Sequence, residues 1–408
     1  MAHFLWGKVY FHDNFVGFLR EEPGQSISFT YDLNYLNSGH PSISNTLPLK
    51  SEPYISHSGL HPFFDNLVAE GWLESAQTRL LGKHTASRFE LLLAFGLDCA
   101  GAVSVIDPEP EKLDQALIDP NNPMELTVMA SSASLSGVQP KLALIKDDKV
   151  LRPARRGETS THIGKFPTRH LDDMVANEFL TTIAIKALLP EDDVVELYIG
   201  DIQGFDEQAL IIKRFDRHDE PDGKHSKRIH FEEFNQLLGL TSNAKYDGAH
   251  KDMANFINTT KGCLPSETYR LYLRIIAGLL LGNTDMHFKN FAMFNTGSSF
   301  RLTPSYDQFS GFIYNYKTIA LAIYGARNLP LGNIKPVNII KLGEEFGLKP
   351  EAIKMANDQL AKNLEACKQV ISESKLGSEI LKNQLIDLIG KRWNGTFALI
   401  GNHLSKKP

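Results

Sequence analysis

Cysteine is scarce in this sequence, and its few cysteines do not form a disulfide pattern. Cys99, Cys263 and Cys367 lie far apart, and the chain contains no CxxC pair. Zinc sites usually use such pairs or closely spaced histidines. The histidines of segment 218–230 lack that spacing and lie in a charged stretch, which is more typical of a solvated loop. We therefore expect a reducing compartment, the cytoplasm.

Long apolar runs and a strong net charge are also absent. The longest apolar run, at 275–281, is far below the ~20 residues that would span a bilayer. The first residues lack the basic start and the apolar stretch of a signal peptide. With 43 basic and 48 acidic residues, the formal net charge is −5. This balance argues against a protein held to nucleic acid by its overall charge, and we expect a soluble protein without a membrane partner.

The 408 residues are too many for one small domain. We predict a mixed domain at 1–110, a strand-rich lobe at 111–230 and a helical lobe at 231–408. The segment 107–123 is rich in turn-forming and charged residues, so it is the best candidate for a linker. A strand-rich lobe followed by a helical lobe predicts a two-lobed protein, and ligands commonly bind between lobes.

Alternation and helical spacing of apolar residues predict the elements of each part. In the first domain the predicted strands are 5–11, 17–19, 26–31 and 101–106, and the predicted helices are 62–81 and 87–95. The second has predicted strands at 141–145, 162–166, 195–199 and 209–215, and a helix at 172–189. The third has predicted helices at 231–240, 250–259, 267–281, 336–346, 350–374 and 378–400, with a strand-rich interruption at 290–307.

Asp285 and Asn290 give the sharpest chemical signal. They stand at the two ends of Asp-Met-His-Phe-Lys-Asn, directly after an apolar helix that would fix the loop. Phosphoryl transfer from ATP needs a carboxylate that orients the substrate hydroxyl and an amide oxygen that holds Mg²⁺ nearby. Taken alone, the same spacing also fits a polar turn in which Asn290 caps a neighbouring element.

Three more side chains would complete a site for Mg-ATP. A turn signal at 295–299 predicts a hairpin that returns Asp307 to the neighbourhood of Asn290. Because Mg²⁺ commonly takes one or two oxygen ligands from a protein, these two residues would suffice. Lys165 is the candidate for the nucleotide phosphates, and Glu178 on the following helix is its candidate partner. The alternatives are that Asp307 caps the next segment and that the lysine and glutamate are ordinary surface residues.

Two segments of the second domain could hold the nucleotide. The loop Ser134-Leu-Ser-Gly-Val-Gln-Pro-Lys141 could lay backbone N–H groups against phosphates, although it could equally be an ordinary turn before a strand. The strand at 210–217 ends where the lobes should join. A hinge there would expose backbone groups to an adenine, with Asp216 near the ribose, whereas on its own this segment resembles an edge strand with solvated charges.

Taken together, these segments resemble the HipA family of serine/threonine kinase toxins. The resemblance rests on six motifs that follow the family's order: Ser-Leu-Ser-Gly-Val-Gln-Pro-Lys at 134–141, Thr-His-Ile-Gly-Lys-Phe-Pro at 161–167, Asn-Glu at 177–178, Arg-Phe-Asp-Arg at 214–217, Gly-Asn-Thr-Asp-Met-His-Phe-Lys-Asn-Phe at 282–291 and Leu-Thr-Pro-Ser-Tyr-Asp at 302–307. It covers 95–310 well, while 1–95 is similar to the family's small N-terminal subdomain and 320–408 matches only as helices. The resemblance implies an α+β, two-lobed protein-kinase-like fold with a small mixed N-terminal subdomain, a strand-rich N-lobe and an all-helical C-lobe.

The resemblance also implies a role for each motif, with ATP and Mg²⁺ as cofactors. Asp285, Lys165 and Glu178 would be the catalytic residues, and Asn290 with Asp307 would hold Mg²⁺. The loop 136–141 would cover the nucleotide, and 213–215 would be the hinge that faces the adenine. The residues expected to contact the bound nucleotide are Ser136, Gly137, Val138, Gln139, Pro140, Lys141, Lys165, Lys213, Arg214, Phe215, Asp216, His287, Lys289, Asn290, Tyr306 and Asp307.

Regulation and partners are implied in the same way. Ser134 falls where the family places an autophosphorylated serine, and about −2 of added charge beside a phosphate site would repel ATP. Ser136 is a second hydroxyl of this loop, and which serine is modified stays open. The implied partners are a helix-turn-helix antitoxin like HipB, operator DNA reached through that antitoxin, and a protein substrate of the aminoacyl-tRNA synthetase class whose phosphorylation stops translation.

Two alternatives remain open at the level of sequence. The same machinery could phosphorylate the hydroxyl of a small molecule, although the serine-containing loop and the N-terminal domain favour the toxin. The chain could also be a non-catalytic binding module that retains the fold. The joint presence of Lys165, Asp285, Asn290 and Asp307 argues against that second alternative.

Overall fold

The computed structural model describes residues 4–109, 139–147, 150–167, 173–219 and 226–405. The chain folds into two compact units. Unit 1 comprises Met1–Thr168, Leu197–Asn243 and Phe294–Ser298, and unit 2 comprises Arg169–Glu196, Ala244–Met293 and Ser299–Pro408. The predicted catalytic loop thus lies in unit 2, together with the helix at 172–189. The division into three domains stays a prediction.

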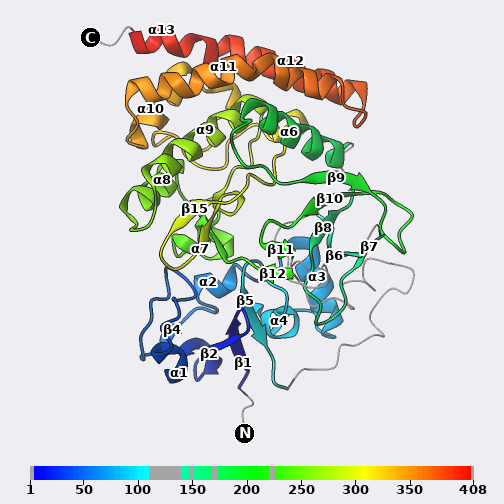
Figure 1. The fold of residues 1–408 in the computed structure, drawn as a ribbon, viewed down its shortest axis with the longest axis vertical. Helices are drawn as coiled ribbons and strands as arrows, with labels where there is room; N and C mark the ends of the chain where they lie inside the picture. The colour runs from blue at the N-terminus through cyan, green and yellow to red at the C-terminus, as the bar shows by residue number, and fades with distance from the viewer. Residues whose placement is uncertain (1–3, 110–138, 148–149, 168–172, 220–225, 406–408) are drawn as a thin grey trace. The chain divides into compact units, whose positions relative to one another are not determined.

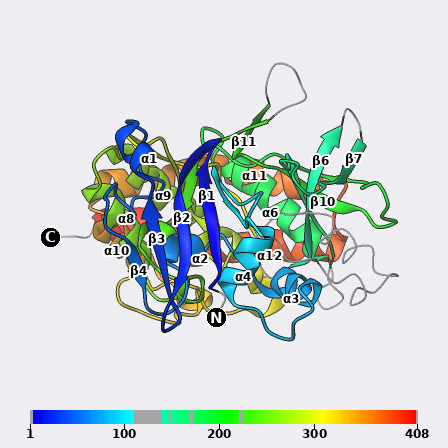
Figure 2. The same ribbon diagram turned by 90° about the horizontal axis from the view of Figure 1, so that it is seen from below.

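An antiparallel sheet of order β4-β3-β2-β1-β5 forms the N-terminal part of unit 1 (Figure 2). Its strands are β1 (Trp6–Phe11), β2 (Asn14–Glu22), β3 (Ser26–Tyr31), β4 (Tyr54–Ser56) and β5 (Val103–Ile106). A tight turn joins β1 to β2, and His12 adopts a positive φ of 52° in it. Gly17 allows β3 to approach β2, because a Cβ there would lie 2.1 Å from the carbonyl oxygen of Thr30.

In the described residues, four helices accompany this sheet, and the core between them is aromatic and aliphatic. The helices are α1 (Leu33–Asn37), α2 (Pro62–Asp65), α3 (Gly71–Leu80) and α4 (Arg88–Phe95). Ser87 caps α4 through a capping box with Glu90, which satisfies N–H groups that a helix start leaves open. Phe29, Phe64 and Leu92 are among the buried residues of this core.

The single helix predicted at 62–81 is wrong, because the chain breaks between α2 and α3. Gly71, the first residue of α3, has a φ of +62°, a left-handed conformation that does not occur in the interior of a right-handed helix and so marks the break. The guanidinium of Arg88 donates to the carbonyl oxygen of Asp65 at 2.7 Å. Tertiary hydrogen bonds therefore satisfy a carbonyl that a continuous helix would have used.

A second five-stranded sheet of order β7-β6-β8-β10-β9 lies in unit 1. Its strands are β6 (Lys141–Asp147), β7 (Val150–Pro153), β8 (His162–Lys165), β9 (Leu197–Gly200) and β10 (Ala209–Lys213). The short strands β11 (Arg217–Asp219) and β12 (Ser226–Arg228) pair separately, and β13 (Phe231–Glu233) leads into α7 (Phe234–Leu237). The helix predicted at 231–240 is therefore wrong over its first turn, where the chain is extended.

Unit 2 is mainly helical, as predicted for this part of the chain. Its helices are α6 (Met174–Leu188), α8 (His250–Thr259), α9 (Pro265–Leu281), α10 (Pro336–Glu345), α11 (Pro350–Ser372), α12 (Glu379–Gly395) and α13 (Ile400–Ser405). α11 packs against α6 and α12, and Figure 1 shows these helices side by side. The strands β14 (Ala292–Asn295) and β15 (Phe300–Leu302) are neighbours in a sheet, which matches the predicted interruption.

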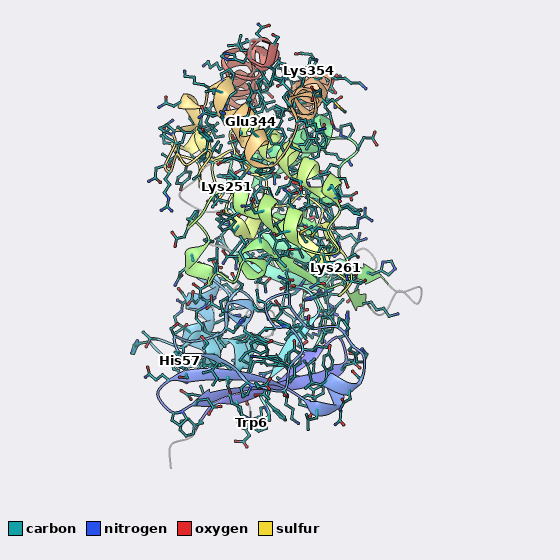
Figure 3. All side chains as sticks on the ribbon, turned by 90° about the vertical axis from the view of Figure 1, so that its left-hand side faces the viewer. Trp6, His57, Lys251, Lys261, Glu344 and Lys354 are labelled. Atoms are coloured by element: carbon teal, nitrogen blue, oxygen red, sulfur yellow. The ribbon has the colours of Figure 1, made fainter. Side chains whose placement is uncertain are left out.

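Some charged side chains of the helical unit lie on its outside. Lys354 in α11 and Lys251 in α8 are largely exposed, and Figure 3 shows both at the surface of their helices. Lys354 pairs with Asp358 one turn further on, at 2.6 Å, an exposed contact that contributes little to stability. None of the described helices is both long enough and apolar enough to cross a membrane.

Candidate active site

Helix α9 positions the predicted catalytic loop. Nearly all of its second half is buried, including Leu279, Leu280 and Leu281. Gly282 ends the helix with a left-handed φ of 82°, the usual way to terminate a helix. A Cβ at Gly282 would lie 2.5 Å from Leu388, so a larger residue would be both strained and crowded. The loop therefore starts from a fixed point in the core of unit 2.

Asp285 lies at the exposed tip of this loop, and its carboxylate is held from two sides. Its Oδ1 accepts a hydrogen bond from the Tyr246 hydroxyl at 3.0 Å. Its own N–H donates to Oδ1 of Asn283 at 3.1 Å. The protein packed around the carboxyl raises the pKa of Asp285, and the nearby charge of Asp307 adds to this, while Tyr246 and Lys245 act in the opposite direction. The aspartate is thus accessible to solvent but partly desolvated, as expected of a reacting group.

The rest of the loop is a short 3₁₀ turn, Phe288–Asn290, capped by His287. Nδ1 of His287 accepts from the N–H of Lys289 at 3.3 Å, and Oδ1 of Asn290 accepts from the N–H of His287 at 3.2 Å. Burial lowers the pKa of His287 to about 3, so the ring is neutral at physiological pH. Because its Nδ1 accepts a hydrogen bond, the ring proton belongs on Nε2.

Asp307 lies close to this loop in unit 2. Its negative charge adds to the burial that raises the pKa of Asp285 and partly opposes the burial that lowers the pKa of His287, as a carboxylate near both groups does. Asp307 has a positive φ of 54°, and a non-glycine residue holds such a conformation only when its surroundings fix it. The preceding residue contributes, since the Tyr306 hydroxyl donates to the carbonyl oxygen of Lys289 at 2.8 Å.

Lys165 and Glu178 belong to different units. Glu178 is a buried residue of α6 in unit 2, and Lys165 is a buried residue at the end of β8 in unit 1. Within unit 1, Lys165 is the register partner of Lys141 on the adjacent strand β6. Residues directly opposite each other in antiparallel strands project from the same face of the sheet. Two buried lysines therefore stand side by side on that face.

The structure describes the last residues of the predicted nucleotide-covering loop, 139–141. The side-chain amide of Gln139 donates to the carbonyl oxygen of Phe166 at 2.8 Å, and the Phe166 N–H donates to the carbonyl oxygen of Pro140 at 3.0 Å. The end of the loop is thus fastened to the end of β8, one residue beyond Lys165. The predicted residues Ser134, Ser136, Gly137 and Val138 lie outside the described residues.

Arg214 of the predicted hinge at 213–215, and Asp216 just after it, belong to a buried cluster of charged side chains. Arg214 donates to both carboxylate oxygens of Asp216 at 2.9 and 2.8 Å. Asp98 belongs to the same cluster, because its Oδ1 lies 2.8 Å from Nη2 of Arg217. All four side chains are buried. Burial opposes ionisation of Asp216, but the arginines outweigh it and hold its pKa well below the usual range. The side chains of Arg214 and Asp216 are therefore engaged within unit 1, and a nucleotide contact at this segment would involve its backbone, Lys213 or Phe215.

Several residues that shape the site were not predicted from the sequence. Tyr246 lies 39 positions before Asp285, and no local pattern marks it as a partner of the loop. Asn283 and Asn177 both stand inside quoted motifs, but they carry no chemistry of their own that would single them out. Among the described residues, no group of three or more His, Cys, Asp or Glu side chains is placed to hold a metal ion. The metal ligands expected here are one amide and one carboxylate, which is a different donor set.

Comparison with a solved structure defines the fold class of this chain. The solved structure of the Shewanella oneidensis MR-1 toxin-antitoxin system of HipA, HipB and its operator DNA matches with a TM-score of 0.77 at 23% identity, covering 97% of this chain and 99% of the matched one. This likeness shows the fold, a mixed α+β kinase-like fold, and confirms the predicted fold class.

Matches to family models and to related proteins show the family to which this chain belongs. The model of the HipA N-terminal domain matches residues 7–106, and that of the HipA-like C-terminal domain matches residues 133–368. The serine/threonine-protein kinase toxin HipA of Shewanella oneidensis is 30% identical over 323 residues, 72% of each protein. Y4mE of Sinorhizobium fredii is 27% identical over 330 residues, 75% of this chain and 77% of Y4mE. The chain belongs to the HipA family of serine/threonine-protein kinase toxins, as its motifs predicted, and it is a kinase.

Proposed function

We propose that this kinase uses Mg-ATP to phosphorylate a serine or threonine hydroxyl of a cellular protein, with Asp285 as the residue that orients the hydroxyl and accepts its proton. The observation that carries the proposal is the Asp285 carboxylate itself. It is exposed at the end of a buried helix, partly desolvated, and hydrogen-bonded by Tyr246. A base with a raised pKa is better matched to proton transfer near neutral pH than an ordinary aspartate.

The donor set of unit 2 fits Mg²⁺. Asn290 offers an amide oxygen that also accepts the His287 N–H, and Asp307 offers a carboxylate close to the same loop. Both are hard oxygen donors of the kind that Mg²⁺ prefers. Asn290 and Asp307 would hold the ion. When bound, Mg-ATP supplies the transferable phosphoryl group, with part of its charge neutralised.

The roles of the remaining residues follow from their positions. Lys165 and Lys141, side by side on one face of their sheet, would attract the phosphates, since two adjacent cations favour a polyanion. The neutral ring of His287 would donate from Nε2 to an oxygen without adding charge. Glu178 would pair with Lys165 as in other kinases. Lys213 and Phe215 would contact the adenine, with Lys289 and Tyr306 beside the phosphates.

The partners are proposed from the family. The related Shewanella toxin was solved with HipB and operator DNA, so we propose that this chain binds a HipB-like antitoxin and reaches DNA through it. The proposed target is an aminoacyl-tRNA synthetase, and the proposed self-inactivation is phosphorylation of Ser134, Ser136 or both. Added charge in a loop that covers ATP would weaken nucleotide binding.

One experiment tests the proposal. The purified chain is incubated with lysate and radiolabelled Mg-ATP, and the wild type is compared with Asp285→Asn. We expect labelled protein in the wild-type reaction only, and mass spectrometry then identifies the target and any phosphate on Ser134 or Ser136. Equal labelling by the two proteins would refute the role of Asp285. Label only on small molecules would indicate a small-molecule phosphotransferase instead.

A further inference from the structure

Asn177 of helix α6 is fully buried and makes a two-point contact with the backbone of one residue. Its Oδ1 accepts from the N–H of Ser310 at 2.9 Å, and its Nδ2 donates to the carbonyl oxygen of Ser310 at 3.2 Å. The Thr181 hydroxyl, one turn further along α6, donates to the same Oδ1 at 3.0 Å and so fixes the amide. Among natural side chains of this length only asparagine can both donate and accept here.

Ser310 lies just after Asp307, and the segment is also fastened on the other side of the aspartate. The N–H of Ser305 donates to the carbonyl oxygen of Asp193 at 2.8 Å, and the N–H of Val195 donates to the carbonyl oxygen of Ser305 at 3.0 Å. Asp193 and Val195 follow α6 in the chain. The α6 region thus holds the Asp307 segment at two points, before and after the residue with a positive φ.

Helix α9 also contacts this segment, at Thr303, which like Ser305 lies before Asp307 in the chain. Arg274 donates to the carbonyl oxygen of Thr303 at 2.7 Å, and Asp192 holds its guanidinium in a buried ion pair. Asp192 also comes directly after α6. The segment 303–310 is therefore fixed to both α6 and α9 by buried polar contacts, which are costly to break because their groups would remain unpaired.

The held segment is linked to the catalytic loop. The side-chain amide of Asn283 donates to Gln308 at 3.4 Å, and its oxygen accepts from the N–H of Asp285 at 3.1 Å. Gln308 itself donates to the carbonyl oxygen of Tyr306 at 2.8 Å. Both Asn283 and Gln308 are buried. Any displacement of the 303–310 segment would therefore be transmitted to the backbone at Asp285.

We propose that Asn177 is a positioning residue that sets the distance between Asp307 and the catalytic loop by clamping the backbone of Ser310 to α6. This inference rests on the proposed function, in which Asp307 holds Mg²⁺. It also gives α6, which carries Glu178, a fixed place in unit 2, because the helix is bound to the metal-binding segment and packs on α9 and α11.

The test is Asn177→Leu, which keeps the size of the side chain but removes both hydrogen bonds. Its matched control is Asn363→Leu, because Asn363 of α11 donates to the carbonyl oxygen of Leu188 at 2.9 Å and so ties α6 down without touching Ser310. Residues that orient metal ligands typically change metal affinity by 10–100-fold. We expect the Mg²⁺ concentration for half-maximal phosphotransfer to rise by about tenfold in Asn177→Leu and to stay at the wild-type value in Asn363→Leu.

Each outcome has a distinct meaning. If the wild type is active, Asp285→Asn is inactive, and Asn177→Leu has the Mg²⁺ dependence of the wild type, the positioning role is refuted while the proposed function stands. If the control shifts as much as Asn177→Leu, the effect is general loosening of α6, and the positioning role is refuted again. An inactive wild type refutes the proposed function itself.

A second variant covers the case in which Asn177→Leu does not fold. Thr181→Val is nearly isosteric and removes only the hydroxyl that fixes the Asn177 amide. A single hydrogen bond of this kind contributes about 1 kcal/mol, so we expect the half-maximal Mg²⁺ concentration to rise by about two- to fivefold. A folded Thr181→Val protein with an unchanged Mg²⁺ dependence would overturn the positioning role.

Discussion

The burial of Glu232 predicts how the free energy of unfolding changes with pH, and by how much. It is completely buried in unit 1, and it accepts hydrogen bonds from the Ser44 hydroxyl, the Asn45 N–H at 3.2 Å and the Asn295 side chain at 2.8 Å. Burial nevertheless raises its pKa from 4.5 to about 7. Because one pKa unit corresponds to about 1.4 kcal/mol, the difference between the folded and unfolded values is worth about 3 kcal/mol.

The direction in which stability changes with pH follows from the proton that Glu232 binds. Between about pH 4.5 and 7 the folded state holds a proton on Glu232 that the unfolded state releases. The contribution of Glu232 to stability is therefore fully present below pH 4.5 or so and is lost as the pH rises to about 7. Glu232→Gln remains neutral at every pH, so we expect it to match the wild type near pH 4 and to exceed it by about 3 kcal/mol near pH 8.

The measurement is the free energy of unfolding in urea, followed by circular dichroism at several pH values between these limits. Ser44→Ala serves as a control, because it removes a donor to the ionised carboxylate and should extend the loss of stability to a higher pH than in the wild type. The reasoning is refuted if the difference between wild type and Glu232→Gln does not change with pH, or if the wild type gains on the variant as the pH rises. Either result would mean that the hydrogen bonds outweigh burial.

Three further predictions concern the site and its support. Tyr246→Phe removes a hydrogen bond to the ionised form of Asp285 and so raises the pKa of that aspartate further; we expect the acidic limb of kcat/KM to move to higher pH. Asp98→Asn leaves two buried arginines less well compensated, and we expect a loss of about 3 kcal/mol in the free energy of unfolding. Lys141→Met removes the cation beside Lys165, and we expect the KM for ATP to rise by about tenfold, which corresponds to about 1.4 kcal/mol.

Matched variants make these outcomes specific. Tyr198→Phe alters an exposed tyrosine of unit 1 and should leave the pH profile unchanged. Glu158→Gln breaks the Arg152 ion pair, which is partly exposed, and should cost less than 1 kcal/mol or so. If Asp98→Asn costs no more than this surface variant, the buried ion cluster contributes little. If Lys141→Met lowers only kcat, the lysine is not a ground-state phosphate contact.

The long elements of the fold could be predicted because their signals are local. The apolar spacing at 350–374 and 250–259 identified α11 and α8 nearly to the residue, since one face of each helix must be buried. The break at 66–70 could not be predicted, because it depends on Arg88 taking up carbonyl groups from a distant part of the chain. The extended start of 231–240 has the same kind of cause, since Glu232 bonds to Ser44 and Asn295.

The sequence by itself determined the family and the residue types of the site. Asp285, Asn290 and Asp307 stand in motifs whose order is specific, and chemistry limits what such oxygen donors can hold. Only the tertiary structure decided how these groups are supported. Hydrogen bonds such as that from Tyr246 to Asp285 and that from Asn177 to Ser310 join residues 39 and 133 positions apart. No local pattern encodes such partners, because the contacts exist only after the helices have packed.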